Sequence, residues 1–383
     1  MSKIIIETIT PIHIGSGELL QHNTDFVVDR QGEDSFIYVV DESKILKLIG
    51  EENIDHWMAS IDKKESTSKL VKVFAPKADY ADYSLRKITN YALRIHPGAT
   101  MKEAIHNGMG FPYIPGSSIK GAMRTAVLAS VAAQIDSVTL GNDIQQKGRD
   151  GLPQTDKFGN KRLTAKHVEE KLFGKDPNND LFRFVRVGDA YFEKDCLIAT
   201  RMISLNIRDN HEDLIDEKSP QLIEAVGPSE ESEFQLSIAK DYYEWAKQRL
   251  ASIGDLPSGL RSINDLFMLI NQHTKQLVEY EIDYWKDTGK SGADYYIESM
   301  EDILNEINSC ETGKSCVLRI GHGSGWRFIT GAWTERLENF YPDVHDVSRP
   351  HNKTKYDGYD FPKTRRMDEE SFVLGFVKLT IKD

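Results

Sequence analysis

The chain has 383 residues, of which 39% are hydrophobic and 28% are charged, and these proportions are ordinary for a soluble globular protein. The usual domain size predicts two domains, or three, each with a sizeable core. The formal net charge of −12 argues against a free-standing, non-specific nucleic-acid binder, although it leaves room for a local RNA-binding groove.

The chain shows no membrane, export or cofactor signal. Its first apolar run is interrupted at Glu7, which is typical of a strand rather than a signal peptide, and no run reaches the about 18 residues of a membrane span. Three cysteines, an odd number, predict a reduced, cytoplasmic protein without a disulfide framework. The histidines and cysteines have no zinc-binding spacing, and Thr312–Ser315 resembles only the end of a phosphate-binding loop, because Asn308 replaces its first glycine. We therefore expect no metal or other cofactor.

In chain order, hydrophobic periodicity predicts a first strand, a hairpin and then helices in the N-terminal half. The strand covers residues 3–14, the hairpin covers 26–40, and helical spacing follows at 41–49, at 80–94 and from Lys120 to about residue 134. Residues 141–162 have almost no apolar periodicity and predict a loop.

The C-terminal half continues with strands, a long helical region and further strands. Strands are predicted at 183–192 and 234–238, helices from about 239 to 308, and strands again at 315–320 and 372–381. Strands interleaved with helices in this order indicate an α+β protein, with two βαββαβ-type units and helical insertions. We place the domains at residues 1–208 and 209–383, the second containing the helical insertion and a glycine-rich loop.

The segment Tyr113–Thr125 reads as a Pro-Gly turn followed by a helix that opens with basic residues. Ser117 or Ser118 can cap the helix start, where unpaired N–H groups and the helix dipole favour an anion. Lys120 and Arg124 are four residues apart and share one helical face. This pattern predicts a phosphate-binding site, and the alternative is an ordinary solvated helix face.

Two glycine-rich segments follow predicted strands. Both carry Gly-Ser-Gly and a nearby histidine, and their residues are Gly15, Ser16 and Gly17 in the first, and Gly321, His322, Gly323, Ser324 and Gly325 in the second. Closely spaced glycines favour the approach of another backbone, for which RNA is the natural candidate, although they can also build tight turns. His322 and Trp326 can stack on a base, and a core anchor is an equal alternative for Trp326.

His13 and Asp25 are weaker candidates. A histidine near neutral pKa can act as a general base on an RNA 2′-hydroxyl, but a single histidine within Ile-His-Ile is more often structural. Asp25 is interpreted as a turn or cap residue. Residues 340–366 interleave aromatic and basic side chains, a pattern that suits single-stranded RNA or a long surface loop.

The motif Ile114–Arg124, together with the segments Thr10–Gly17 and Arg319–Trp326, resembles the signature of the RAMP superfamily, the RNA-binding subunits of CRISPR effector complexes. The order and separation of the three motifs look most like the subunit that caps the three-prime end of the guide RNA in type III-A (Csm) complexes. The resemblance implies ferredoxin-like, RRM-like folds, and it implies RNA contacts at the three motifs.

The resemblance also implies a function and partners. The chain would be a non-catalytic subunit that binds the three-prime region of the guide crRNA and supports its maturation in antiviral defence. Its partners would be guide crRNA, target RNA, the repeated backbone subunit, the small helical subunit and outside nucleases. The alternative is a metal-independent CRISPR-RNA endoribonuclease with His13 as general base, and a third reading is a small-molecule or nucleotide enzyme that uses the glycine loops.

Overall fold

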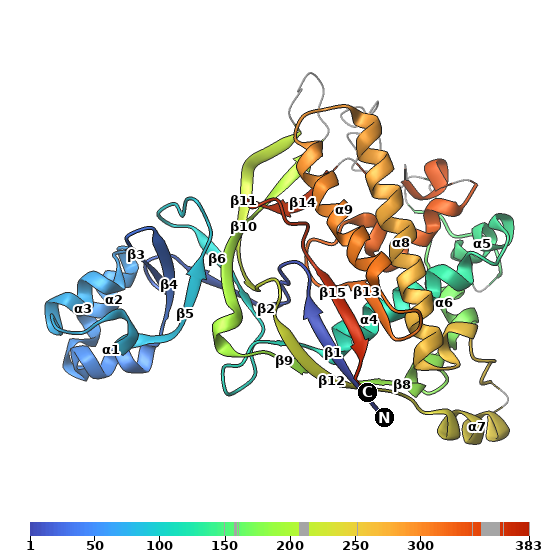
Figure 1. Ribbon diagram of the computed structural model, residues 1–383, viewed down its shortest axis with the longest axis horizontal. Helices are drawn as coiled ribbons and strands as arrows, with labels where there is room; N and C mark the ends of the chain where they lie inside the picture. The colour runs from blue at the N-terminus through green and yellow to red at the C-terminus, as the bar shows by residue number, and fades with distance from the viewer. Residues whose placement is uncertain are drawn as a thin grey trace.

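The computed structural model describes residues 1–148, 150–156, 159, 161–206, 214–250, 252–338, 340–345, 361–362 and 364–382, without the side chains of 216–219 and 341–343. It is a mixed α+β structure in which two large sheets carry the helices on their faces and edges (Figure 1). The α+β class predicted from the sequence is therefore confirmed. The three cysteines are all free.

A five-stranded sheet joins the two ends of the chain. Its order is β13–β15–β1–β12–β8, and every neighbouring pair is antiparallel. The strands are β1 (Ser2–Thr8), β8 (Val185–Val187), β12 (Glu231–Ile238), β13 (Ser315–Arg319) and β15 (Phe376–Ile381). Ile4 and Ile6 of the central strand β1 are fully buried, as the period of two in a strand predicts. The first and last strands therefore lie side by side.

An eight-stranded sheet adjoins the first. Its order is β2–β6–β11–β10–β5–β4–β3, and β14 pairs with β10 beside this path. The strands are β2 (Gly15–Gln21), β3 (Phe26–Gln31), β4 (Asp34–Val40), β5 (Ser84–Asn90), β6 (Thr100–Ala104), β10 (Leu197–Asn206), β11 (Ile215–Val226) and β14 (Thr364–Asp368). Strands from both sides of the predicted boundary at 208/209 enter both sheets, and that division stays a prediction.

Two predicted elements are wrong. The helix expected at 80–94 is a short 3-10 turn, η2 (Tyr80–Tyr83), followed by strand β5. Pairing of β5 with β4 and β10 buries Ile88 completely, and this tertiary gain overrides the weak helical spacing. The strand expected at 183–192 is divided into the turn η3 (Leu181–Phe184), β8 and β9 (Ala190–Tyr191), and β9 pairs with the short strand β7 (Tyr113–Ile114).

Helices cover the five-stranded sheet and extend from the eight-stranded one. They are α1 (Glu42–Ile49), α2 (Ile54–Asp62), α3 (Thr67–Phe74), α4 (Gly116–Ala132), α5 (Ser137–Ile144), α6 (Lys166–Phe173), α7 (Lys240–Arg249), α8 (Ile263–Thr288) and α9 (Ala293–Ser309). The shorter turns are η1 (Glu51–Asn53), η4 (Lys194–Cys196), η5 (Ser258–Leu260), η6 (Trp326–Phe328), η7 (Thr330–Arg336) and the π-type turn η8 (Phe340–His345). In the described part of the chain, none of these helices combines the length and the apolar character of a membrane span.

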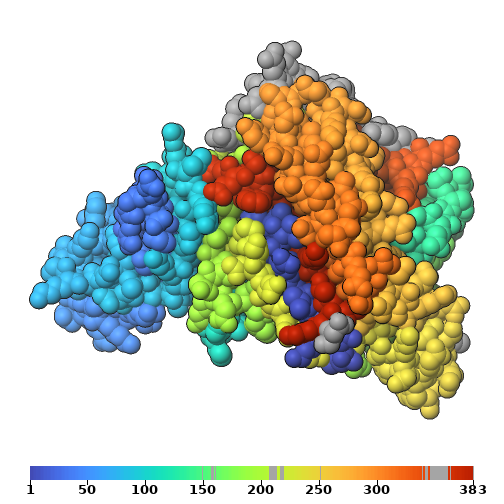
Figure 2. Space-filling view, viewed as in Figure 1, coloured from blue at the N-terminus to red at the C-terminus, as the bar shows by residue number. Residues whose placement is uncertain are grey.

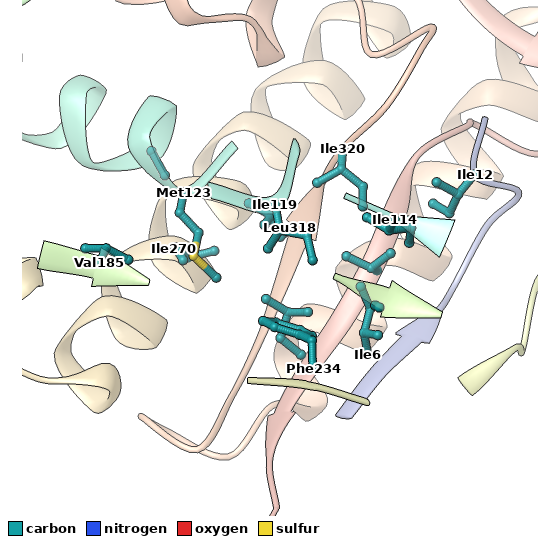
Figure 3. Close-up of a cluster of buried hydrophobic side chains, with 14 of the residues drawn as sticks. Ile6, Ile12, Ile114, Ile119, Met123, Val185, Phe234, Ile270, Leu318 and Ile320 are labelled. Atoms are coloured by element: carbon teal, nitrogen blue, oxygen red, sulfur yellow. The ribbon is translucent and has the colours of Figure 1, made fainter. Parts of the chain in front are cut away.

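The main core lies where α4 and α8 pack against each other and against the five-stranded sheet. Figure 3 shows Ile119 and Met123 of α4 and Ile270 of α8 meeting Phe234 of β12 and Leu318 of β13. The helix predicted from Lys120 to about residue 134 is therefore confirmed, and its apolar face is buried at Ile119, Met123 and their neighbours one turn on.

Helices α1–α3 form a separate lobe on the β3–β4–β5 end of the eight-stranded sheet (Figure 2, blue). Ile45, Ile49, Val71 and Tyr83 make a small core of their own inside this lobe. The described part of the loop predicted at 141–162 begins with the end of α5 and continues through isolated bridges, such as Lys147 with Pro153.

A buried ion triad joins α8 to the segment after the second glycine loop and to β14. Arg327 Nη1 lies 2.7 Å from Glu281 Oε1, and Arg365 Nη2 lies 2.7 Å from the same oxygen. The hydroxyl of Tyr296 donates to Glu281 Oε2 at 2.8 Å. Burial alone would raise the pKa of Glu281, but the charges of Arg365 and Arg327 outweigh it and lower the pKa to about 2.

We expect Glu281→Gln to lower the free energy of unfolding by about 3–5 kcal/mol at pH 7, because two buried guanidinium groups lose their counter-charge. The folded pKa lies below the ordinary 4.5, so the carboxylate stabilises the fold fully above about pH 4.5 and progressively less toward pH 2. Urea titrations of both proteins at pH 7, 5 and 3 measure this difference. A difference that stays constant down to pH 3 would contradict the ionic role of Glu281.

Candidate nucleic-acid interface

The two Gly-Ser-Gly segments, about 300 residues apart in the sequence, meet at His13. The backbone N–H of His322 donates to the carbonyl oxygen of His13 at 2.9 Å. Ile320 N–H donates to the carbonyl oxygen of Gly375 at 2.7 Å, and Gly375 N–H donates to that of Pro11 at 3.0 Å, so the start of the second loop is held beside the segment that leads into the first. The sequence echo between the two segments therefore corresponds to one place in the molecule.

Three glycines of the second loop have left-handed backbone conformations, with φ of +81° at Gly321, +85° at Gly323 and +75° at Gly325. A Cβ atom at Gly321 would lie only 2.7 Å from the carbonyl oxygen of His13. The sequence predicted that another backbone approaches these glycines closely. At Gly321 that backbone is the protein's own, at His13. Contact of the other glycines with RNA stays a prediction.

The exposed part of this junction forms what we call the glycine-loop surface, composed of Gly15, Ser16, Gly17, Lys102, Gly321 and His322. Lys102 on β6 places Nζ 3.3 Å from His322 Nε2, and Ser16 Oγ donates to Glu103 Oε2 at 2.9 Å. Burial, with the charges of Lys102 and Arg366, lowers the pKa of His322. Lys102 is the cation at this surface that sequence reasoning missed, because nothing in the pattern of β6 distinguishes it.

His13 lies beneath this surface with 2% of its area exposed. Its Nδ1–H donates to the carbonyl oxygen of Glu224 at 2.6 Å, and its ring centroid is 5.7 Å from that of His322. Burial lowers its pKa to about 4, and the charges of His322 and Lys102 act in the same direction, against the hydrogen bond to Glu224. His13 is therefore an uncharged, internally bonded side chain.

Three charged side chains, Arg86, Glu103 and Glu224, form a network beside His13. Arg86 Nε lies 2.7 Å from Glu224 Oε1, and its Nη2 lies 2.9 Å from both Glu224 Oε2 and Glu103 Oε1. Glu103, His106 and Glu224 bring their ligand atoms within 4.8 Å of one another, which is the spacing of a metal site. The guanidinium of Arg86 already occupies oxygens of both carboxylates and offsets one of their two negative charges, so we interpret the arrangement as an ion-pair network.

The start of α4 differs from the predicted anion cradle. The helix begins at Gly116, whose N–H donates to Asp189 Oδ1 at 2.7 Å, and neither Ser117 nor Ser118 caps it. The serine-cap prediction is therefore wrong, because Asp189, between β8 and β9, supplies the negative charge that the helix start favours. Ser117 is exposed and Ser118 is half-buried.

Lys120 and Arg124 share one face of α4, as predicted, and line an open groove of about 840 Å³. Arg124 Nη1 contacts both carboxylate oxygens of Asp180, at 2.9 and 2.8 Å, and its guanidinium lies 4.3 Å from the ring centroid of Phe173. Burial lowers the pKa of Lys120, Asp180 raises it and Arg124 lowers it. The charged side chains of the groove are Lys120, Arg124, Lys166, Glu169, Glu170, Lys175, Asp176, Asp180 and Arg183. Acids thus offset most of its basic charge.

The described aromatic side chains expected to stack on RNA bases mostly pack against other side chains of the protein. Trp326 is half-buried, with its ring 5.3 Å from Phe361 and 6.3 Å from Phe340, which favours the core-anchor alternative. Ser324 and Gly325 are also half-buried. Of the predicted aromatic and basic stretch at 340–366, residues 346–360 and 363 lie outside the described residues, and Arg365 belongs to the buried triad.

Comparison with known proteins gives relatives over most of the chain. The protein is 24% identical to the CRISPR system protein Csm5 of Methanocaldococcus jannaschii over 336 residues, which cover 85% of this chain and 71% of that protein. Its fold matches a chain of a Csm–crRNA–target RNA ternary complex from a type III-A CRISPR-Cas system, with a TM-score of 0.68, 17% identity and 100% coverage of both chains.

The fold also matches the crystal structure of Csm5 from T. onnurineus, with a TM-score of 0.66, 17% identity and coverage of 97% of this chain and 99% of that one. The model of the RAMP superfamily matches residues 5–327, which include all three motifs identified in the sequence. The chain therefore belongs to the RAMP superfamily.

Proposed function

We propose that this chain is a Csm5-like subunit of a type III-A CRISPR complex that binds the three-prime region of the guide crRNA and supports its maturation. The observation that carries the proposal is the glycine-loop surface, where the exposed residues 15–17, the exposed start of the second loop at Gly321 and His322, and Lys102 meet over His13. A surface with short side chains lets a nucleic-acid backbone come close to the sheet, and a cation beside it can meet a phosphate. The likeness to Csm5 over most of the chain supports the same assignment.

We extend this proposal to the fold and the partners. In chain order, β1, α4, β8, β12, α8 and β15 follow the βαββαβ pattern, with the last strand beside the first, which supports one ferredoxin-like unit. A second such unit would lie in the eight-stranded sheet. The partners would be guide crRNA, target RNA, other Csm subunits and outside nucleases, within the cytoplasm.

The subunit would have no catalytic role of its own. The alternative endoribonuclease needs His13 as general base, but this side chain is buried, has a pKa of about 4 and donates its Nδ1–H to Glu224. A base is most effective when its pKa lies near the working pH, so His13 is poorly suited to that step.

We expect the tagged protein, purified from its own host, to bring guide RNAs with ragged three-prime ends together with other Csm subunits. Lys102→Ala should lower the amount of RNA per protein, because one phosphate contact is lost. Lys69→Ala, on the exposed face of α3, is the matched control and should have no effect. RNA sequencing and mass spectrometry measure both, and the absence of CRISPR RNA and of Csm partners would overturn the proposal.

Lys120 and Arg124 should behave differently. Lys120→Ala should reduce the slope of log affinity against log salt by about 0.7, the value for one phosphate contact to a single strand, without altering stability. Arg124→Ala should also lower the free energy of unfolding by about 1–3 kcal/mol, because Asp180 loses its partner. Salt titrations of RNA binding and urea unfolding separate the two effects. Equal loss of stability in both variants would contradict this assignment.

His13→Asn tests the catalytic alternative, because the asparagine amide can still donate to the Glu224 carbonyl. We expect the variant and the unchanged protein to give the same guide RNA lengths when RNA from the purified complexes is sequenced. Loss of a guide-RNA cleavage product in the variant, with RNA binding retained, would instead establish the endoribonuclease.

A further inference from the structure

Helix α7 lies at one corner of the molecule (Figure 1), and two of its aromatic side chains are exposed to solvent. In this helix of ten residues, 37% of the surface of Tyr242 and 48% of that of Trp245 are exposed. The adjoining face of α7 holds the helix to the protein, because Tyr243 and Ala246 are buried and the rings of Tyr242 and Tyr243 both meet buried Phe184 edge to face. Tyr242 thus has one edge against the core, whereas the ring of Trp245 contacts Tyr242 and Arg249 on the surface.

These rings are part of a row of planar groups. The guanidinium of Arg183 lies 5.1 Å from the ring centroid of Tyr242, and the rings of Tyr242 and Trp245 are stacked at 5.7 Å with 22° between their planes. The guanidinium of Arg249 lies 4.4 Å from the ring of Trp245. We call Arg183, Tyr242, Trp245 and Arg249 the cation–aromatic row.

The helical repeat explains the row. Residues 242, 245 and 249 are spaced by three and four, so they share one face of α7, and Arg183 reaches the end of this face from η3. Arg183 also donates to the carbonyl oxygen of Asn178 and to the hydroxyl of Tyr242, which fixes its position. The row is thus held in place by packing and hydrogen bonds before any ligand arrives.

The row also adjoins the groove beside α4. Arg183 lines that groove together with Lys120 and Lys175, so a ligand that follows the groove reaches Tyr242 next. The two parts differ in chemistry. The groove offers cations among acids, whereas the row offers flat rings with a guanidinium at each end.

We propose that the cation–aromatic row binds single-stranded RNA by base stacking. A single strand alternates flat bases with phosphates, and stacking on aromatic rings or guanidinium planes accepts any base sequence. Arg183 and Arg249 supply positive charge at both ends of the row, which complements the phosphates. The inference rests on the proposed function for the identity of the RNA, but it assigns a second surface, apart from the glycine loops.

The test uses the intact complex purified with the tagged full-length chain. Ultraviolet cross-linking followed by peptide mass spectrometry should place a nucleotide adduct on the peptide that contains Tyr242 and Trp245. Trp245→Phe should keep this adduct, because its ring still stacks, whereas Trp245→Ala should lose most of it. Tyr295→Ala is the matched control, since Tyr295 is 53% exposed on α9 and should not affect the adduct.

A second measurement gives the change in RNA affinity when the ring of Trp245 is removed. With the purified chain and a fluorescein-labelled oligouridine of about 12 nucleotides, Trp245→Ala should raise Kd about 10-fold, and Trp245→Phe should change it little. Adducts confined to the glycine loops, with an unchanged Kd in Trp245→Ala, would overturn the inference and leave the proposed function standing.

Two other outcomes also decide the matter. If Trp245→Ala leaves the RNA in place but releases a protein subunit, the row is a protein contact and the inference is overturned. If the unchanged complex contains no RNA at all, the proposed function fails and the inference fails with it.

Discussion

Strand β1 lies between β12 and β15, and most of the arrangement described above depends on this pairing. It places the beginning and the end of the chain in one sheet, so the loops that follow β1 and β13 leave the sheet close together. The carbonyl oxygen of His13 then accepts the N–H of His322, and the contact at Gly321 admits no side chain. The glycine-loop surface is therefore a consequence of sheet order.

Two arginines that the sequence connects with RNA, Arg124 and Arg365, pair with acids of the fold instead, Arg124 with Asp180 and Arg365 with buried Glu281. Arg327 pairs with Glu281 in the same way, and Arg86 pairs with Glu224. Each pairing removes a positive charge from the surface and joins segments that are distant in the sequence. A chain with a net charge of −12 can hold RNA only where cations remain accessible. The candidate RNA-binding surfaces are therefore the glycine loops, the α4 groove and the cation–aromatic row on α7.

If the proposals above hold, these surfaces would divide the recognition of a single strand into separate tasks. The glycine-loop surface would accept the RNA backbone, the groove would offer cations beside acids, and the exposed rings of α7 would stack on bases. Because acids in the groove weaken non-specific attraction, binding there would depend on a strand that the rest of a complex has already positioned. This division is consistent with a subunit that works in an assembly rather than alone.

The sequence by itself determined the features that depend on local preference. Residues 116–132, 263–288 and 293–309 form helices because their apolar side chains recur at helical spacing. Gly321, Gly323 and Gly325 adopt positive φ because glycine does so cheaply. The three motifs also sufficed to indicate the superfamily.

Only the tertiary structure decided the features that depend on residues far apart in the chain. Pairing with β4 and β10 makes residues 84–90 a strand. The carboxylate of Asp189 accepts the first N–H of α4, and the fold places Lys102 beside His322. Such contacts join residues separated by tens to hundreds of positions, and no periodicity or local spacing encodes them.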